Sequence, residues 1–366
     1  MKKVLLLVLL FFCLTLGVKA EHILGKAISV ESKEVSIGGS YSIQQLVNVE
    51  VLRGKDKGSI FELENIISGN PYYDINVVQN DKLVLHSENE MGETSYFIAD
   101  VYRMNSFLFL AGLFCILVLI IGRRKGLYSL VSIAVTVVLI YSVLCPLILV
   151  GVNPLCATLG ISLVSTLVTM YLVGGFNRKS TAATIGTVAS LFIAGIMSLL
   201  TIKFAKLTGF SDETFLYVYT SHPELNFISI TASMMILAAL GAVMDIAMSI
   251  ASTINEIYVN NNSLSIKELF HSGMNVGRDV IGTMANTLIL VYMGGALPLL
   301  LLSSNIDAWK FFNLNTVVTE ISSAIIGSIA LLLCVPITAI VAAYLIRFGN
   351  ENIENRAIIE KNSIEE

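Results

Sequence analysis

Long stretches without a charged side chain constrain this chain more than any other feature of its sequence. The longest is residues 126–177, and shorter stretches of the same kind lie at 104–122, 180–202, 225–244, 280–305 and 321–346. Each is long enough for a helix that crosses a bilayer, which takes about 20 residues. Only 14% of the chain is charged, against about 25% in soluble domains, so most of it is expected to face lipid.

The stretch at 126–177 is too long for one span and is predicted to hold two. A Gly-Val-Asn-Pro sequence at 151–154 divides it, because glycine and proline together mark a turn. The stretch that begins at 225 continues past Asp245 to about residue 251. The sequence therefore predicts an α-helical polytopic membrane domain of about seven helices at 104–347, followed by a polar tail at 348–366.

The first twenty residues have the pattern of a secretory signal peptide. Lys2 and Lys3 precede an apolar run at 4–18, and small residues stand at Val18 and Ala20. The run is short for a membrane span, which favours cleavage after Ala20 over the alternative of an uncleaved anchor. In both cases the residues that follow are delivered outside the cytoplasm.

Residues 21–103 have the composition and pattern of a small β domain. They carry 13 acidic and 7 basic residues and alternate apolar with polar side chains, as at 46–52. Turn sequences such as Gly69-Asn70-Pro71 separate the alternating runs. Five strands are expected, at 23–31, 43–53, 58–65, 81–88 and 95–103, which suit a small all-β barrel of the OB or SH3 type.

Basic residues near the ends of the predicted spans indicate the orientation of the chain. If the β domain lies outside, only Lys203, Lys206 and Lys310 join it there. Ten others are then cytoplasmic: Arg123, Arg124, Lys125, Arg178, Lys179, Lys267, Arg278, Arg347, Arg356 and Lys361. Cytoplasmic loops carry an excess of Lys and Arg. The chain is therefore expected in the plasma membrane, with 21–103 extracytoplasmic and the C-terminus cytoplasmic.

Several classes of function find no support in the composition. The net charge of −4 and the acidic β domain argue against nucleic-acid binding. Cys13, Cys115, Cys145, Cys156 and Cys334 all lie in apolar stretches, with no CxxC or Cys/His metal spacing. No metal site, disulfide framework or cofactor is therefore expected.

One acidic residue, Asp245, lies well inside a predicted span, roughly 9 Å from its cytoplasmic end at 1.5 Å per residue. An ionisable group there costs at least about 2.5 kcal/mol. Ser249, one turn further on, extends a polar stripe, and Thr283 and Asn286 share a face of the next span, with Asn286 at a similar depth. These four side chains are predicted to line a substrate- or ion-binding pocket. The alternative is a hydrogen bond that packs two helices.

Two charged residues, Arg278 and Asp279, mark the start of that next span. Asp279 is expected to cap free backbone amides at a helix N-terminus. Arg278 is expected to anchor the helix at the membrane interface. The alternative role is an ion pair with a carboxylate or a lipid phosphate. Both are therefore predicted to be interface charges.

An enzyme is not expected. Asp245 and Asp279 on neighbouring helices suggest an intramembrane aspartyl protease, in which two carboxylates share a proton. Asp279, however, follows Gly277-Arg278 rather than the Gly-x-Gly-Asp context of such enzymes, and Asp245 lacks a preceding Tyr. HExxH, GxSxG and P-loop patterns are absent from the sequence as well.

Three blocks of this sequence resemble the YibE/F-like family of bacterial multipass membrane proteins. They are 240–256 (LGAVMDIAMSIASTINE), 272–295 (SGMNVGRDVIGTMANTLILVYMGG) and 326–338 (IGSIALLLCVPIT), and 96–103 (YFIADVYR) is similar to the approach to the family's first helix. The likeness covers about 105–347 and is to the longer form of the family, which has an extracytoplasmic domain. It implies a paralogous membrane partner but no mechanism, since the family lacks an established biochemical activity.

Two functions follow as expectations. The first is permease-like transport of a small solute or ion, with Asp245 as a proton or cation site. The second is non-catalytic, a membrane subunit that scaffolds the extracytoplasmic domain for a protein partner. The expected partners are the lipid bilayer and either a paralogue or a second copy of the chain.

Overall fold

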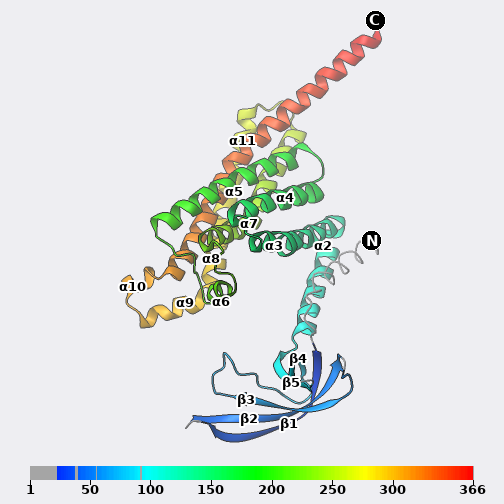
Figure 1. The fold of residues 1–366 in the computed structure, drawn as a ribbon. Coiled ribbons are helices and arrows are strands. Elements are labelled where there is room, and N and C mark those ends of the chain that lie inside the picture. Colours follow the sequence, from blue (N-terminus) through cyan, green and yellow to red (C-terminus); the bar gives the residue numbers. More distant parts are fainter. Residues whose placement is uncertain (1–22, 38–39, 55, 91–92, 366) are drawn as a thin grey trace. The chain divides into compact units, whose positions relative to one another are not determined.

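A computed structural model describes residues 23–37, 40–54, 56–90 and 93–365, and the chain divides into two compact units (Figure 1). One unit ends at Gly122 and contains the strands, and the other begins at Arg123 and contains most of the helices. The predicted signal peptide at 1–20 lies outside the described residues.

The first unit contains a nearly closed five-stranded antiparallel barrel, which confirms the predicted small all-β domain. The sheet order is β3-β2-β1-β4-β5, and the two edge strands β3 and β5 contact each other. The strands are β1 (Ile23–Ile37), β2 (Ser40–Arg53), β3 (Ile60–Ile67), β4 (Lys82–Glu90) and β5 (Glu93–Val101).

The interior of the barrel follows the alternation of the sequence. Val47, Val49 and Val51 on β2 are buried and face Leu83 and Leu85 on β4 across one hydrophobic core. Alternate residues of a strand point to the same side of the sheet, so burying every second residue leaves the polar ones to solvent.

An aromatic pair and a hydrogen bond join the edges of the barrel. The rings of Phe61 on β3 and Tyr96 on β5 lie 4.8 Å apart between centroids. The Tyr96 hydroxyl donates to Asp56 Oδ2 at 2.5 Å, which ties β5 to the turn before β3. After β5, Arg103 donates to Asp100 Oδ2 at 2.6 Å, and this bond holds the pKa of the Asp100 carboxyl below its usual range.

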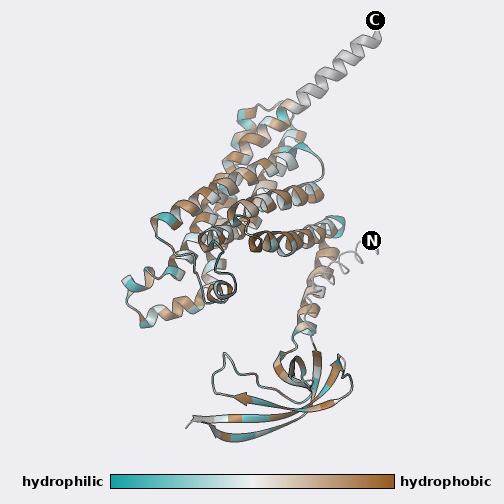
Figure 2. Ribbon diagram, viewed as in Figure 1, coloured by the Kyte–Doolittle hydropathy of each residue, from teal (hydrophilic) through white to brown (hydrophobic). Residues whose placement is uncertain are grey.

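Long apolar helices make up the rest of the chain, as Figure 2 shows by their brown colour. The helices are α2 (Met104–Val138), α3 (Cys145–Leu149), α4 (Pro154–Gly174), α5 (Arg178–Phe204), α6 (Thr214–Ser221), α7 (Phe227–Asn260), α8 (Ile266–Gly295), α9 (Leu297–Leu302), α10 (Ala308–Phe312) and α11 (Asn315–Glu365). A π-helical turn at Leu139–Leu144 joins α2 to α3.

Five of these helical segments are long and apolar enough to cross a membrane, or six if α8 and α9, which bend by 65°, count as one span. The seven predicted spans all fall on these segments, because Met104–Leu149 holds two of them in 46 residues. Arg123, where the sequence places a basic loop, leaves the helical conformation inside α2 with φ 48° and ψ −124°. The helical membrane architecture is therefore confirmed.

The core of the helical unit lies where α5, α7, α8 and α11 pack together. Small residues bring these helices close, as at Gly277 on α8, where an added Cβ would overlap Val335 on α11 and lie 3.3 Å from Ile250 on α7. Helix pairs in membranes associate through such small residues. The packing therefore defines which face of α8 is covered and which is exposed.

Candidate functional site

Asp245 lies on an exposed face of α7. Its neighbours Val243, Ile246 and Ala247 are fully buried in the core, whereas the side chains of Asp245 and Ser249 are exposed. The structure gives Asp245 no hydrogen bond or ion pair with any described residue. The carboxylate is therefore an ionisable group on an apolar helix without a described partner.

The polar residues of α8 also lie on an exposed face. Thr283, Asn286 and Asp279 are exposed, while Gly273 and Gly277 are buried against α7 and α11. The Thr283 hydroxyl donates to its own helix, to the Val280 carbonyl at 3.0 Å. No contact between the α7 group and the α8 group is described, so the pocket predicted from Asp245, Ser249, Thr283 and Asn286 stays a prediction.

The expectation that Asp279 caps a helix is wrong. Helix α8 begins at Ile266, more than three turns earlier, because Ser265 and Glu268 form a capping box. The Glu268 carboxylate accepts from the Ser265 N–H at 2.8 Å, and Ser265 Oγ accepts from the Glu268 N–H at 3.3 Å. Asp279 is an exposed residue within the helix, and Arg278 beside it donates to Asn275 Oδ1 at 3.1 Å.

A cavity of about 510 Å³ lies between α8, α9, α10 and α11. The chain bends by 65° between α8 and α9 beside this cavity, and Pro298 in the first turn of α9 fits such a bend. The walls are almost wholly apolar, with Ile289, Met293, Leu300, Phe311, Phe312, Val317 and Ile321 among them. Three polar side chains, those of Tyr292, Ser303 and Glu320, also line it.

Tyr292 and Glu320 give this cavity its chemistry. The Tyr292 hydroxyl is buried and has no hydrogen-bond partner among the described residues. The Glu320 carboxylate is partly buried and interacts electrostatically with Tyr292 and with Asp212. A carboxyl group and a buried, unpartnered hydroxyl therefore belong to residues that line an otherwise apolar space.

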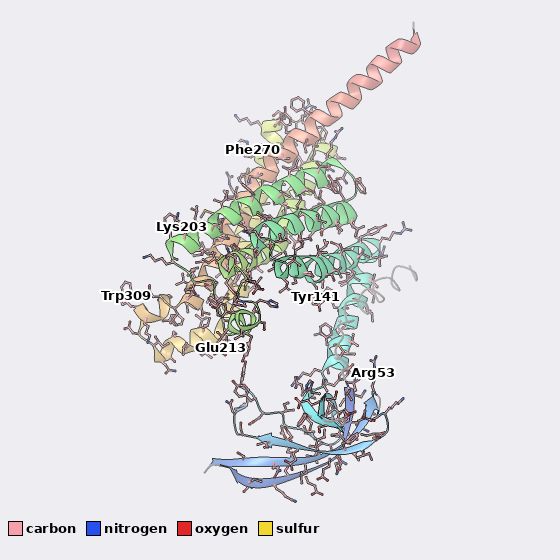
Figure 3. All side chains as sticks on the ribbon, in the orientation of Figure 1. Arg53, Tyr141, Lys203, Glu213, Phe270 and Trp309 are labelled. Carbon is pink, nitrogen blue, oxygen red and sulfur yellow. The ribbon has the colours of Figure 1, made fainter. Side chains whose placement is uncertain are left out.

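A second, more open cavity of about 590 Å³ adjoins the first, and Leu299 lines both. It carries the acidic side chains of Asp212 and Glu213 together with Thr316. Figure 3 labels Glu213 where the chain enters α6 and Trp309 on α10. The second cavity therefore places two acidic side chains on the other side of a residue, Leu299, that also lines the Glu320 cavity.

Hydrogen bonds fix the segment that carries Asp212 onto the first turn of α11. The Thr208 N–H donates to Asn315 Oδ1 at 3.1 Å, and the Asn315 amide donates to the Phe210 carbonyl. The Thr231 hydroxyl on α7 donates to the Gly209 carbonyl at 2.9 Å. These bonds place Asp212 near Glu320, although about a hundred residues separate the two in sequence.

The Glu320 cavity is the feature that the sequence prediction missed. Glu320 directly precedes the uncharged stretch at 321–346, so the sequence prediction placed it outside the membrane span. Helix α11 in fact begins at Asn315, so Glu320 lies inside it. The usable signal was the pattern Asn-Thr-Val-Val-Thr-Glu at 315–320, in which an acidic residue follows an apolar helical turn.

The described residues contain no group of three or more His, Cys, Asp or Glu side chains that could hold a metal ion. Among those residues Cys115, Cys145, Cys156 and Cys334 are free.

Comparisons with known proteins assign the family. The model of the YibE/F-like protein family matches residues 110–348, and that of the YibE/F family N-terminal domain matches residues 24–101. No curated protein and no solved structure matches the chain. Because the two matches cover the barrel and nearly all of the apolar helices, the chain belongs to the YibE/F-like family.

Proposed function

We propose that this chain is a permease-like membrane protein that moves a small solute or ion, with Asp245 as its proton or cation site. The observation that carries the proposal is the lone carboxylate on α7, which has no ion pair or hydrogen bond among the described residues. Ionisable residues inside membrane spans mark ion pathways and proton relays, because each is costly to insert.

The polar residues of α8 supply further ligands in this proposal. Ser249 lies one turn from Asp245 on α7, and Thr283 and Asn286 lie on the exposed face of α8. Carboxylate, hydroxyl and amide oxygens are ligands that hard cations prefer. No contact between the two groups is described within the chain, so in this proposal a movement of α8, or a neighbouring copy or paralogue, completes the site.

The orientation proposed for the chain follows from its basic residues and its predicted signal peptide. The barrel lies outside the cytoplasm of a bacterial cell and the C-terminus lies inside.

Flux measurements on the full chain in proteoliposomes test the proposal. We expect Asp245→Asn to abolish coupled flux of the transported ion, because the variant can neither bind a proton nor neutralise a cation. Glu256→Gln, which removes an exposed carboxylate at the end of the same helix, is the matched control and should keep wild-type flux. Protons, Na⁺, K⁺ and a panel of metabolites are the solutes to measure.

The same measurement separates a second candidate function, a subunit that scaffolds the barrel for a protein partner. Exposed aromatic residues on the barrel favour it, since Tyr72 and Tyr73 are 76% and 71% exposed with their rings in edge contact at 4.8 Å. Large exposed aromatic side chains are typical of interfaces. Wild-type flux by Asp245→Asn would exclude Asp245 as a transport site. If deletion of residues 21–103 then abolishes function while Asp245→Asn does not, the scaffold role is favoured.

A further inference from the structure

We propose that the cavity between α8 and α11 binds a monovalent, hydrophobic organic cation, such as a protonated aryl-alkyl amine. The cavity of about 510 Å³ has the size of a small-molecule site, and Glu320 supplies the one charged group in its lining. The inference goes beyond the proposed function, because it depends on neither Asp245 nor transport.

Charge is the first argument for a cation. None of the ion pairs found among the described residues involves Glu320, and no Lys or Arg lines either cavity. An ionised carboxylate against apolar walls needs a positive charge or hydrogen bonds to compensate it and otherwise takes up a proton, so a bound cation would keep Glu320 ionised. Asp212 and Glu213 in the adjoining cavity add negative potential, which attracts a cation and repels an anion.

The apolar walls argue for an organic cation rather than a bare metal ion. A metal ion needs several oxygen ligands, and the lining offers only Glu320, Tyr292 and Ser303 as polar side chains. Aromatic rings at Phe311, Phe312 and Tyr292 instead suit an ammonium group and its hydrocarbon body. Burial of that body supplies affinity that a hydrated ion would not gain.

The Tyr292 hydroxyl points to a protonated amine in particular. Its oxygen is buried and has no partner among the described residues, and a buried polar atom is costly to leave unpaired. An ammonium N–H can donate to this oxygen while its charge faces Glu320. A quaternary ammonium has no N–H and cannot form this bond.

Binding of three matched probes to the full chain in nanodiscs tests the inference. The probes are 4-phenylbutylammonium, its trimethylammonium analogue and the anion 4-phenylbutanoate, measured by calorimetry in phosphatidylglycerol, a lipid without an amine. The wild-type chain should bind both cations and not the anion. Comparable binding of the anion would overturn the proposal without any variant.

Two variants assign the roles of the side chains. Glu320→Gln should weaken both cations about thirtyfold or more, because the buried partner charge is lost. Tyr292→Phe should weaken only the primary ammonium, by about tenfold. Glu256→Gln is the carboxylate control and should bind as wild type does. Unchanged cation binding by Glu320→Gln, with a retained unfolding temperature, would overturn the assignment.

The outcome is separable from that of the proposed function. If the chain binds the cations but shows no flux, the cation-binding cavity is supported and transport is contradicted. If the chain shows flux but does not bind the cations, and the cations do not inhibit that flux, the cation-binding cavity is contradicted. A third result is that the primary ammonium binds in phosphatidylglycerol nanodiscs and fails to bind in phosphatidylethanolamine nanodiscs. That result would support the cavity as an ammonium site and would show that the amine of the lipid headgroup competes for it.

Discussion

At the scale of single residues, the helical unit is held together where side chains are smallest. Gly186 on α5 packs directly on α11, and an added Cβ would overlap Thr338 Oγ1 and lie 3.2 Å from the Thr338 Cα. Thr338 is fully buried and Cys334 lies within 3.4 Å of its hydroxyl, so neither can move aside easily. Protein interiors are close-packed, and an extra carbon there displaces a neighbour.

A single methyl group at this contact is therefore predicted to destabilise the chain. Gly186→Ala should lower the free energy of unfolding by about 1–3 kcal/mol through overpacking. Gly282→Ala is the matched control, since an added Cβ on α8 there meets nothing within 4 Å, and alanine favours helix by up to about 1 kcal/mol. Thermal unfolding in detergent measures both, and equal midpoints for the two variants would contradict the packing.

At the scale of elements, side-chain hydrogen bonds hold segments that have no regular structure. The segment between β3 and β4 is fixed by Gln45 on β2, which is only 4% exposed. Gln45 Oε1 accepts from the Val77 N–H at 3.1 Å, and Gln45 Nε2 donates to the Val77 carbonyl at 3.2 Å. The glutamine thus supplies to Val77 the pairing that a strand would otherwise provide.

Replacing Gln45 should therefore loosen this segment more than the strands. Gln45→Ala removes both bonds to Val77 and is expected to cost about 1–3 kcal/mol, because a buried amide and carbonyl lose their partner. Hydrogen exchange of the Val77 amide should accelerate strongly. Gln44→Ala, one residue away on the other face of β2, is the control, and similar exchange in the two variants would show that Gln45 does not hold the segment.

At the scale of the whole molecule, the chain combines a unit whose residue pattern suits water with a unit whose residue pattern suits lipid. The strands alternate polar and apolar residues, whereas the spans are apolar on nearly every face, as the two colour patterns of Figure 2 show. Many large apolar side chains of the helical unit are exposed, such as Phe192, Ile196 and Leu200 along α5. Lipid is the environment that makes such a surface stable.

The orientation proposed for the whole molecule can be measured by cysteine labelling in cells. Tyr72→Cys on the barrel should react with a membrane-impermeant maleimide on intact cells. Lys267→Cys, at the start of α8, should react only after the cells are permeabilised. Both positions are exposed in the structure, and the unmodified chain gives the background. Labelling of Lys267→Cys from outside would reverse the proposed topology.

Much of the fold followed from local patterns. The strand predicted at 43–53 starts three residues after the first residue of β2 and ends at the same residue. The uncharged stretches between 104 and 346 coincide with helices. The strand predicted at 23–31 was too short, because β1 continues to Ile37 through a segment that is mostly polar, Ser-Lys-Glu-Val-Ser-Ile at 32–37. Backbone pairing extends it, as Ser32 opposite Gln45 and Ile37 opposite Ser40 show, and such pairing requires no hydrophobic side chain.

The sequence by itself determined where the chain is apolar enough to enter lipid and where it alternates as a strand. Both properties belong to consecutive residues, because a helix satisfies its backbone hydrogen bonds within one segment and a strand exposes alternate side chains. Only the tertiary contacts show that Tyr292 and Glu320 line one cavity and that Asp212 lies near Glu320. Their meeting depends on the 65° bend after α8 and on the hydrogen bonds of Asn315, which join residues that no local pattern relates.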